Sequence, residues 1–374
     1  MNTESAHNTG NAAPTHIDAG YRPYQPLLED GGRAWHELLS AARHIVITAH
    51  RGPDGDAIGS TTALAAWLRR CWDADVHIVV PNIFPDFLKW IPLADEILVY
   101  DKHEADVRPI VEQADLVIMC DHGELSRMWT LGDVVRNHTT PRIIIDHHPN
   151  PEAGIADIVI CHPECSSCCE VLMRLILELD GYAMGTAARP DITHDEATSL
   201  YTGMMTDTGA FTYASNRPEV FELIALLLRC GIDKDIIYRN VFHTYSPARM
   251  KFQGYMLYSK LYVWKKAHTA IMTLTNAERR RFGILNGDTE GLVNMPLQIL
   301  GIKLSIFLRE DTEQPCLRLS LRSVDDFPCN DLAAEFFGGG GHRNAAGGEF
   351  WGTMDDAVEH VKRAVQKYLP KLRD

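Results

Sequence analysis

Short runs of apolar, β-branched residues alternate with helical patterns between about residue 30 and residue 160. The runs are of strand length and lie at 44–49, 76–80, 96–100, 115–120, 142–146 and 155–160. Stretches such as 58–70 and 103–113 separate them and carry their apolar residues on one helical face. Strands that alternate with helices predict a parallel sheet with helices on both faces, which is an α/β fold.

The pattern changes along the rest of the chain. Residues 167–179, 195–206, 218–230 and 233–242 are helical by pattern, whereas strand-like segments at 261–264, 267–274, 303–308 and 317–321 interleave with short helices after residue 246. An amphipathic helix at 355–368 closes the chain. We therefore predict a disordered leader at 1–28, a catalytic α/β domain at 29–243, a helical linker at 244–259 and a smaller mixed α/β substrate-binding domain at 260–374.

Composition excludes several classes of protein. With 45% hydrophobic and 23% charged residues the usage is globular. The longest apolar runs are far shorter than the ~20 residues of a membrane span, and the polar leader has no signal-peptide pattern. Nine cysteines without such a signal indicate reduced thiols in the cytoplasm. We expect a cytoplasmic protein that does not bind membranes.

The net charge of −14 is unevenly distributed. Residues 251–374 carry a net +2, so the first 250 residues carry −16. An acidic front half fits a carboxylate-rich metal site, and the near-neutral back half could hold an anionic ligand. Acidic surfaces are also common in soluble proteins, and charge alone leaves both interpretations open.

Metal-capable side chains follow several of the predicted strands. His50, Asp54 and Asp56 come directly after the first strand, among turn-forming glycines and a proline. Asp121 ends a second strand, and Asp146, His147 and His148 end a third; Asp207 lies where a helix breaks before Gly209. Carboxyl ends of parallel strands meet at one edge of a sheet, which is where such folds bind ligands. A turn with Asp56 as helix cap is the alternative for the first motif alone.

The ligand types suggest the metal. Histidine and carboxylate ligands without thiolate suit Mn²⁺, Fe²⁺, Co²⁺ or Zn²⁺, and a carboxylate majority favours Mn²⁺ or Mg²⁺. Six candidate ligands are too many for one ion, so we expect two divalent ions, most simply Mn²⁺, with Mg²⁺ or Co²⁺ as alternatives. Two ions about 3.5–4 Å apart can share a bridging carboxylate and support in-line attack on phosphorus.

A glycine-rich segment in the second domain is the third signal. Consecutive glycines leave backbone N–H groups uncovered, so that a phosphate or a base can approach closely. Arg322 and Ser323, which follow a predicted strand, form a second candidate anion clamp. A flexible linker and a surface arginine are the structural alternatives. The predicted substrate-binding residues of the segment are Gly338, Gly339, Gly340, Gly341 and His342.

Four cysteines between Cys161 and Cys169 invite a zinc interpretation. No second CxxC or HxxxH pair follows at zinc-finger spacing, and Ser167 with Glu170 three residues later is typical of a capping box that begins a helix. We therefore interpret the cysteines as structural.

These motifs, in this order over about residues 30–370, resemble the DHH phosphoesterase superfamily, in its subfamily with a C-terminal DHHA1 domain. More narrowly, the chain is similar to bacterial nanoRNA exonuclease and pAp-phosphatase proteins. The resemblance implies one metal held by His50, Asp54 and Asp121, and another held by Asp56, Asp121, His147 and Asp207, with Asp121 bridging.

The same resemblance implies the remaining roles. Asp146 would orient the histidines, and His148 would contact the scissile phosphate and protonate the leaving oxygen. Arg322, Ser323 and the 338–342 loop would hold the terminal phosphate and base of the substrate. Two residues depart from the family pattern: Arg51 replaces a small polar residue, and His122 follows the bridging aspartate.

The function that these features imply is two-metal hydrolysis of short 5′-phosphorylated RNA or DNA oligonucleotides of about 2–5 nucleotides to mononucleotides, and of pAp to AMP and phosphate. A cyclic or linear dinucleotide phosphodiesterase stays open, and so does, in another class, an inactive RNA-binding module. The second domain disfavours an inorganic pyrophosphatase, and the absence of a third domain and of a basic groove disfavours a long-chain exonuclease. A homodimer is left open.

Overall fold

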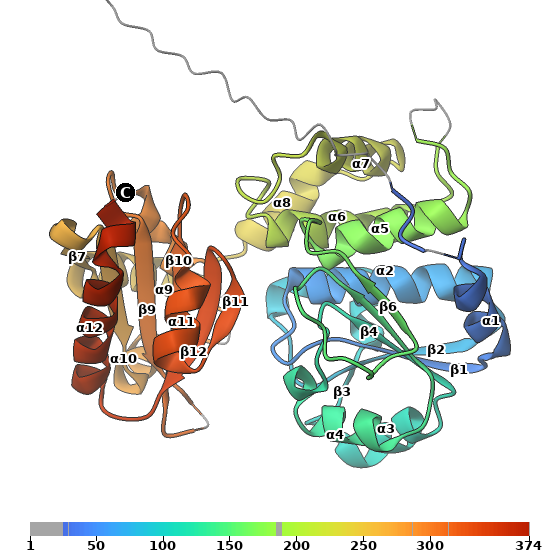
Figure 1. Ribbon diagram of the computed structural model, residues 1–374, viewed down its shortest axis with the longest axis horizontal. Helices are drawn as coiled ribbons and strands as arrows, with labels where there is room; N and C mark the ends of the chain where they lie inside the picture. The colour runs from blue at the N-terminus through green and yellow to red at the C-terminus, as the bar shows by residue number, and fades with distance from the viewer. Residues whose placement is uncertain (1–24, 29, 185–188, 286, 313, 374) are drawn as a thin grey trace, which may run out of the picture.

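The computed structural model describes residues 25–28, 30–184, 189–285, 287–312 and 314–373, which form two α/β domains (Figure 1). The first contains a six-stranded sheet in the order β3-β2-β1-β4-β5-β6, with every neighbouring pair parallel. The predicted α/β fold is confirmed. The strands are β1 His44–Thr48, β2 Asp75–Val80, β3 Leu98–Val99, β4 Leu116–Cys120, β5 Arg142–Asp146 and β6 Ile158–Cys161.

Helices cover both faces of this sheet (Figure 1). Ile45 and Ile47 on β1 point into the larger core, with α2, α5 and α6, whereas Val46 points into the smaller core beneath α3 and α4. The alternation follows from the two-residue period of a strand. The helices are α1 Arg33–Ala41, α2 Gly55–Cys71, α3 Glu104–Glu112, α4 Thr130–Asn137, α5 Cys168–Leu179, α6 His194–Asp207, α7 Pro218–Arg229 and α8 Lys234–Phe242.

The strand order fixes where a ligand can bind. From β1 the chain moves outward to β2 and β3, then returns to place β4 on the other side of β1. Loops that leave β1 and β4 therefore diverge, and open parallel sheets bind ligands in the crevice at that point, outside the carboxyl ends of the strands.

The second domain contains a mixed sheet in the order β11-β12-β10-β9-β8-β7, in which β8 and β9 run parallel. Val361 and Val365 of α12 are buried in its core with Leu332 of α11. Its strands are β7 Tyr262–Trp264, β8 Thr269–Leu274, β9 Leu304–Glu310, β10 Leu317–Ser323, β11 Gly340–His342 and β12 Ala345–Phe350. Its helices are α10 Asn276–Phe282, α11 Cys329–Phe337 and α12 Met354–Arg373.

Helix α9 Pro247–Tyr255 and the π-helical turn Met256–Lys260 occupy most of the segment predicted as a linker. Short 3₁₀ turns lie at Asp86–Leu88, Ala94–Glu96, Leu125–Met128, Lys265–Ala267 and Leu292–Gln298. Among the described residues, no helix combines the length and the apolar character needed to cross a membrane.

Most of the predicted leader, residues 1–24, lies outside the described residues. Its last part belongs to the fold, because Leu27 and Leu28 are buried against the first domain. Their backbone N–H groups donate to the carboxylate of Glu178 at 2.6 and 3.2 Å. Leu27 and Leu28 therefore belong to the first domain and not to the predicted leader.

Helices α2 and α6 cross closely at Gly59, and this contact predicts an effect on stability. A Cβ at residue 59 would lie 2.5 Å from the carbonyl oxygen of Ser199, which is backbone and cannot rotate away. We expect Gly59→Ala to lower the free energy of unfolding by about 1–3 kcal/mol, despite the better helix propensity of alanine. In the control Gly254→Ala, on α9, the new Cβ meets no atom within 4 Å, so stability should rise by up to about 1 kcal/mol. Urea unfolding measures both; equal stabilities for the two variants would contradict the packing argument.

Glu278 in α10 predicts a pH dependence of the second domain. Burial favours its neutral form, but hydrogen bonds from Lys260 (2.8 Å), Tyr255 (2.6 Å) and Thr275 outweigh burial and lower its pKa to about 2. A carboxylate whose folded pKa lies below its unfolded value stabilises the fold above about pH 4.5, and this contribution disappears as the pH falls toward 2.

Glu278→Gln should therefore cost about 1–2 kcal/mol at pH 7, allowing for solvent screening, and only about a quarter of that near pH 2.5. Urea unfolding of wild type and variant at both pH values measures the difference. Glu359→Gln, at an exposed ion pair with Lys362, is the control and should change little at either pH. A penalty for Glu278→Gln that is the same at both pH values would refute the assignment.

Candidate metal centre

Five segments bring the predicted metal ligands together at the carboxyl edge of the first sheet. His147 Nε2 lies 3.5 Å from an oxygen of Asp121, 3.5 Å from one of Asp207 and 3.8 Å from one of Asp56. His50 Nε2 lies 3.1 Å from the other oxygen of Asp121. The segments are the loops after β1, β4 and β5, the start of α2 and the end of α6.

Helix ends position the two aspartates of the first motif. Asp54 caps α2, and its Oδ1 accepts the backbone N–H groups of Asp56 (3.0 Å) and Ala57 (3.1 Å). The cap is thus Asp54, not Asp56. The Asp56 carboxylate instead accepts the backbone N–H groups of Cys168 (2.6 Å) and Cys169 (2.9 Å), at the start of α5. A helix N-terminus favours a carboxylate there, so α5 fixes Asp56 in place.

Asp121 occupies the centre of the cluster and has an unusual backbone. Its φ is +63°, a left-handed conformation that costs energy for a residue other than glycine. The side chain is buried; Oδ2 contacts His50, while Oδ1 has no hydrogen-bond partner. A buried carboxylate oxygen without a partner is costly in a protein interior, and a bound cation would satisfy it.

The Asp146, His147, His148 sequence forms a compact hydrogen-bonded turn after β5. Asp146 Oδ1 accepts the backbone N–H of His147 (2.8 Å) and of His148 (3.1 Å), and lies 2.8 Å from His148 Nδ1. The carboxylate therefore sets the orientation of His148, whose ring is about one quarter exposed. Asp146 Oδ2 is buried and has no hydrogen-bond partner.

The electrostatics of the cluster favour added positive charge. Burial, together with the charges of Asp121 and Asp207, raises the pKa of Asp56 well above its usual value. Burial also raises the pKa of Asp207 to about 7, although the charge of His147 opposes this. For His147, burial alone would lower the pKa, but the neighbouring carboxylates of Asp121, Asp207 and Asp56 raise it to about 10. Carboxylates crowded in this way hold protons or cations.

The donor set fits divalent metal ions. Among the described residues, three groups of side chains with ligand atoms within 4.8 Å of one another contain Asp121. Two consist of predicted metal ligands, namely His50, Asp54 and Asp121, and Asp56, Asp121 and His147; the third joins Asp121 to Asp146 and His148. Nitrogen and carboxylate oxygen donors suit Mn²⁺ and related ions. The buried Oδ1 of Asp121, which has no hydrogen-bond partner, is the observation that most directly indicates a bound cation.

The glycine-rich segment differs from the predicted loop. Residues 340–342 form strand β11, paired with β12 at the edge of the second sheet. A Cβ on Gly339 would lie 1.8 Å from the carbonyl oxygen of Gly347, and one on Gly341, whose φ is +136°, would lie 2.4 Å from the carbonyl oxygen of Ala345. These glycines therefore allow a tight hairpin. The close approach of a ligand, which the sequence predicts for the same glycines, stays a prediction.

His342 nevertheless reaches the candidate centre from the second domain. Its ring stacks on that of His148 at 4.8 Å between centroids and lies 5.1 Å from that of His147. Burial, and then the charges of His148 and His147, lower the pKa of His342 to about 4. Strand β11 lies on the side of the second domain that faces the first (Figure 1), so a neutral imidazole covers His147 and His148.

Arg322 and Ser323 have different surroundings. The Ser323 hydroxyl is buried, donates to the carbonyl of Phe327 (2.7 Å) and accepts from the Asn344 amide (2.9 Å). It thus stabilises the turn after β10. Arg322 contacts the carbonyl of Leu321 at 2.9 Å, and its charge reaches Tyr213, which also lies near Asp207. Of the pair, Arg322 is therefore the residue whose charge acts near the centre.

The two departures from the family pattern lie beside the cluster and not in it. His122 is fully buried, its Nδ1 lies 3.2 Å from the carbonyl of Glu124, and burial with the nearby charges of His50 and Arg127 lowers its pKa to about 3. The Arg51 guanidinium lies over the ring of Trp129. Sequence reasoning missed Trp129 and Tyr213, because a single aromatic residue in a loop gives no periodic signal.

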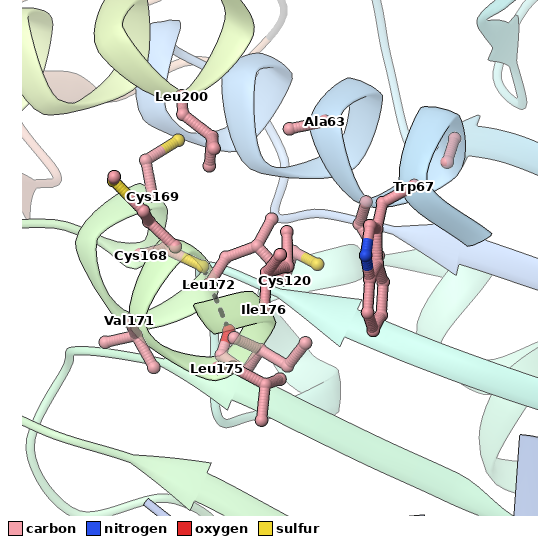
Figure 2. Close-up of a cluster of buried hydrophobic side chains, with 14 of the residues drawn as sticks. Ala63, Trp67, Cys120, Cys168, Cys169, Val171, Leu172, Leu175, Ile176 and Leu200 are labelled. Carbon is pink, nitrogen blue, oxygen red and sulfur yellow. Dashed lines mark hydrogen bonds between the residues drawn. The ribbon is translucent and has the colours of Figure 1, made fainter. Parts of the chain in front are cut away.

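Most of the cysteines between Cys161 and Cys169 pack in the hydrophobic core of the first domain, and one of them donates a hydrogen bond to the backbone of β5. Figure 2 shows Cys120, Cys168 and Cys169 among the side chains of Leu172, Leu175 and Ile176 at the start of α5. Cys168 Sγ donates to the carbonyl of Ile145 (3.1 Å), and burial raises the pKa of both α5 thiols well above the usual value. Within the described residues, none of the side-chain groups suited to a metal contains a cysteine.

Comparison with known proteins places these features in one family. Residues 44–204 match the model of the DHH family, N-terminal domain, and residues 266–369 match the DHHA1 domain. A Thermus thermophilus protein named "Bifunctional oligoribonuclease and PAP phosphatase NrnA" is 30% identical over 339 residues, covering 90% of this chain and 93% of that one. The Bacillus subtilis "Cyclic-di-AMP phosphodiesterase GdpP" is 24% identical over 90% of this chain but only 49% of its own length. The crystal structure of an exopolyphosphatase-related protein from Bacteroides fragilis is 45% identical, with a TM-score of 0.85 over 93% of this chain and 98% of that chain.

Proposed function

Because the chain belongs to the DHH family of phosphoesterases and carries a DHHA1 domain, we propose that it hydrolyses short 5′-phosphorylated oligonucleotides to mononucleotides and pAp to AMP. The observation that carries the proposal is the pair of ligand groups that share Asp121, with His148 beside them. We further propose that the ions held there are two Mn²⁺, with Mg²⁺ or Co²⁺ as substitutes, and that the protein acts in the cytoplasm.

The metal ligands and their supports have distinct tasks. His50, Asp54 and Asp121 would hold one ion, and Asp56, Asp121, His147 and Asp207 the other. When bound, such a pair of ions activates water and neutralises the charge that develops on the phosphate. The N-terminus of α5 keeps Asp56 in position through the backbone N–H groups of Cys168 and Cys169.

His148 is the residue that would protonate the leaving oxygen. Asp146 accepts from Nδ1 and so leaves Nε2 pointing away from its own turn. The doubly protonated ring can donate the Nε2 proton to the leaving oxygen, which would otherwise depart as an unstable alkoxide. His342 covers the same ring from the second domain and limits the access of water.

The second domain supports the preference for short substrates. Arg322 supplies a positive charge near the cluster, and stacking of His342 on His148 brings β11 up to the catalytic edge. A substrate that enters between the domains would place its scissile phosphate on the metals and its terminal phosphate or base against Arg322 and the segment 338–342, with the buried Ser323 stabilising the turn beside Arg322. A long strand would need an open exit across the second domain.

A competition assay tests the proposal. The protein is incubated with Mn²⁺ and equal concentrations of pAp, a 5′-phosphorylated dinucleotide, a cyclic dinucleotide and a 24-nucleotide RNA. We expect loss of pAp and of the linear dinucleotide while the 24-mer stays nearly intact, and no reaction in a parallel sample with excess EDTA. If none of the four is cut with any divalent metal, the proposal is wrong.

A cyclic-dinucleotide phosphodiesterase is the second candidate, favoured by the match to the cyclic-di-AMP phosphodiesterase across 90% of this chain. In the same assay, that function would appear as loss of the cyclic dinucleotide before the linear substrates.

A further inference from the structure

Trp129 is held in a backbone conformation that suits a tryptophan poorly. It lies between the turn Leu125–Met128 and helix α4, with φ +53° and ψ −134°. This is a left-handed region that glycine occupies readily and that a bulky side chain enters only at a cost. The indole is nevertheless 43% exposed, so burial of the ring does not compensate fully for this strain.

Arg51 contacts the indole ring directly. The guanidinium lies over the ring, with Cζ 2.9 Å from its centroid. The backbone of Arg51 is tied to the same turn, because its N–H donates to the carbonyl of Arg127 at 2.7 Å. Arg51 directly follows the candidate metal ligand His50, and Trp129 therefore stands at the rim of the metal centre.

Arg51 also lies close enough to the second domain for its charge to act on Arg309 of β9. Arg309 is partly buried, and its pKa is lowered first by burial and then by the charges of neighbouring arginines, Arg51 among them. A substrate seated between the domains would therefore pass the Arg51–Trp129 pair as well as Arg322, which lies on the Asp207 side of the cluster.

We propose that Trp129, with Arg51 stacked on it, is a platform on which a nucleobase of the substrate stacks beside the metal centre. Nucleobases stack on aromatic rings and on guanidinium planes without regard to sequence. The flat face of an indole has no hydrogen-bond donor to offer a phosphate, which makes a base the better occupant of that face than a second phosphate group. The inference rests on the proposed function and adds a residue that selects nucleotides over other phosphate esters.

The test compares a substrate with a base and one without. The substrates are a 5′-phosphorylated dinucleotide and the same molecule with an abasic residue in place of each nucleoside. Trp129→Gly removes the ring while keeping a residue suited to the backbone, Trp129→Phe keeps an aromatic face, and Trp351→Ala is the control at an exposed tryptophan after β12. We expect Trp129→Gly to lower kcat/KM for the intact dinucleotide about tenfold and to change that for the abasic analogue less than twofold.

Trp129→Phe should retain most of the activity, Trp351→Ala should match the wild type, and the unfolding temperature of Trp129→Gly should be no lower than that of the wild type. Equal losses on both substrates, or a large fall in unfolding temperature, would show that Trp129 only supports the fold near His50. No loss on either substrate would also overturn the platform.

A binding measurement separates this inference from the proposed function. Calorimetry compares the affinities of the wild type and Trp129→Gly for AMP and for ribose 5-phosphate. The platform predicts that the variant loses about tenfold in AMP affinity and keeps its affinity for ribose 5-phosphate. If the wild type cuts no oligonucleotide, the proposed function fails, yet this difference would still establish the platform; if AMP binds equally to both proteins, the platform is refuted.

Discussion

Asp121→Asn is expected to lower the rate of dinucleotide hydrolysis at least about a thousandfold. Asp121 is the one side chain common to both ligand groups, and an amide has neither the charge nor the second acceptor oxygen that two cations require. Loss of the charge stabilisation that metal ions give a phosphoryl transition state is worth several kcal/mol, and each 1.36 kcal/mol is a factor of ten in rate.

A second readout distinguishes loss of metal from loss of fold. A ligand that binds only the folded state at 100 times its dissociation constant stabilises it by about 2.7 kcal/mol. Addition of Mn²⁺ should therefore raise the unfolding temperature of the wild type and of the control Asp133→Asn, an exposed position on α4, but not that of Asp121→Asn. Full activity in Asp121→Asn would refute the assignment of this centre.

Glu170→Ala is expected to produce the largest loss of stability, about 3–5 kcal/mol. Glu170 is completely buried in the first turn of α5 and pairs with Arg217, while its other oxygen accepts the backbone N–H of Ser166 at 2.7 Å. Removing one partner of a buried ion pair leaves the remaining charge and donors without compensation, which costs far more than the loss of a surface pair.

Urea unfolding measures this effect. Glu112→Ala is the matched control, because its carboxylate pairs with Arg108 at the exposed surface of α3 and should contribute no more than about 0.5 kcal/mol. Glu170→Gln keeps the shape and one acceptor and should fall between the wild type and Glu170→Ala. A cost below about 1 kcal/mol for Glu170→Ala would show that the ion pair does not anchor α5.

Hydrophobic patterning predicted the first domain well because its sheet is parallel and buried. Each of the six predicted strands is present, and the clustering of His50, Asp121 and His147 follows from one rule, that the carboxyl ends of parallel strands share an edge. Strand β3 is shorter than predicted because Leu93 has a left-handed backbone and 94–96 forms a 3₁₀ turn in place of extended chain.

Local composition explains why two elements, α4 and β12, were not predicted from the sequence. Helix α4 begins after the strained Trp129 without a capping side chain and contains Gly132, so the sequence gives no start signal for it, although Leu131, Val134 and Val135 are buried on one face. Strand β12 reads Ala-Ala-Gly-Gly-Glu-Phe, a composition poor in strand formers, and it exists because β10 and β11 pair with it on either side.

Some contacts at the metal centre could not be predicted from the sequence because they form between distant parts of the fold. The backbone N–H groups that hold Asp56 come from residues more than a hundred positions away, and no side chain identifies them. The stacking of His342 on His148 joins two domains, and the Arg51–Trp129 contact joins two loops. Such pairings depend on how complete elements pack, which a periodic pattern does not encode.

The central claim is that residues from five segments form one centre for two divalent ions. Equilibrium dialysis of the wild-type protein against Mn²⁺ counts the bound ions directly. The account predicts two Mn²⁺ per chain in the wild type, a number that Asp121→Asn should not reach. Saturation of the wild type at no ion, or at a single ion, would contradict it.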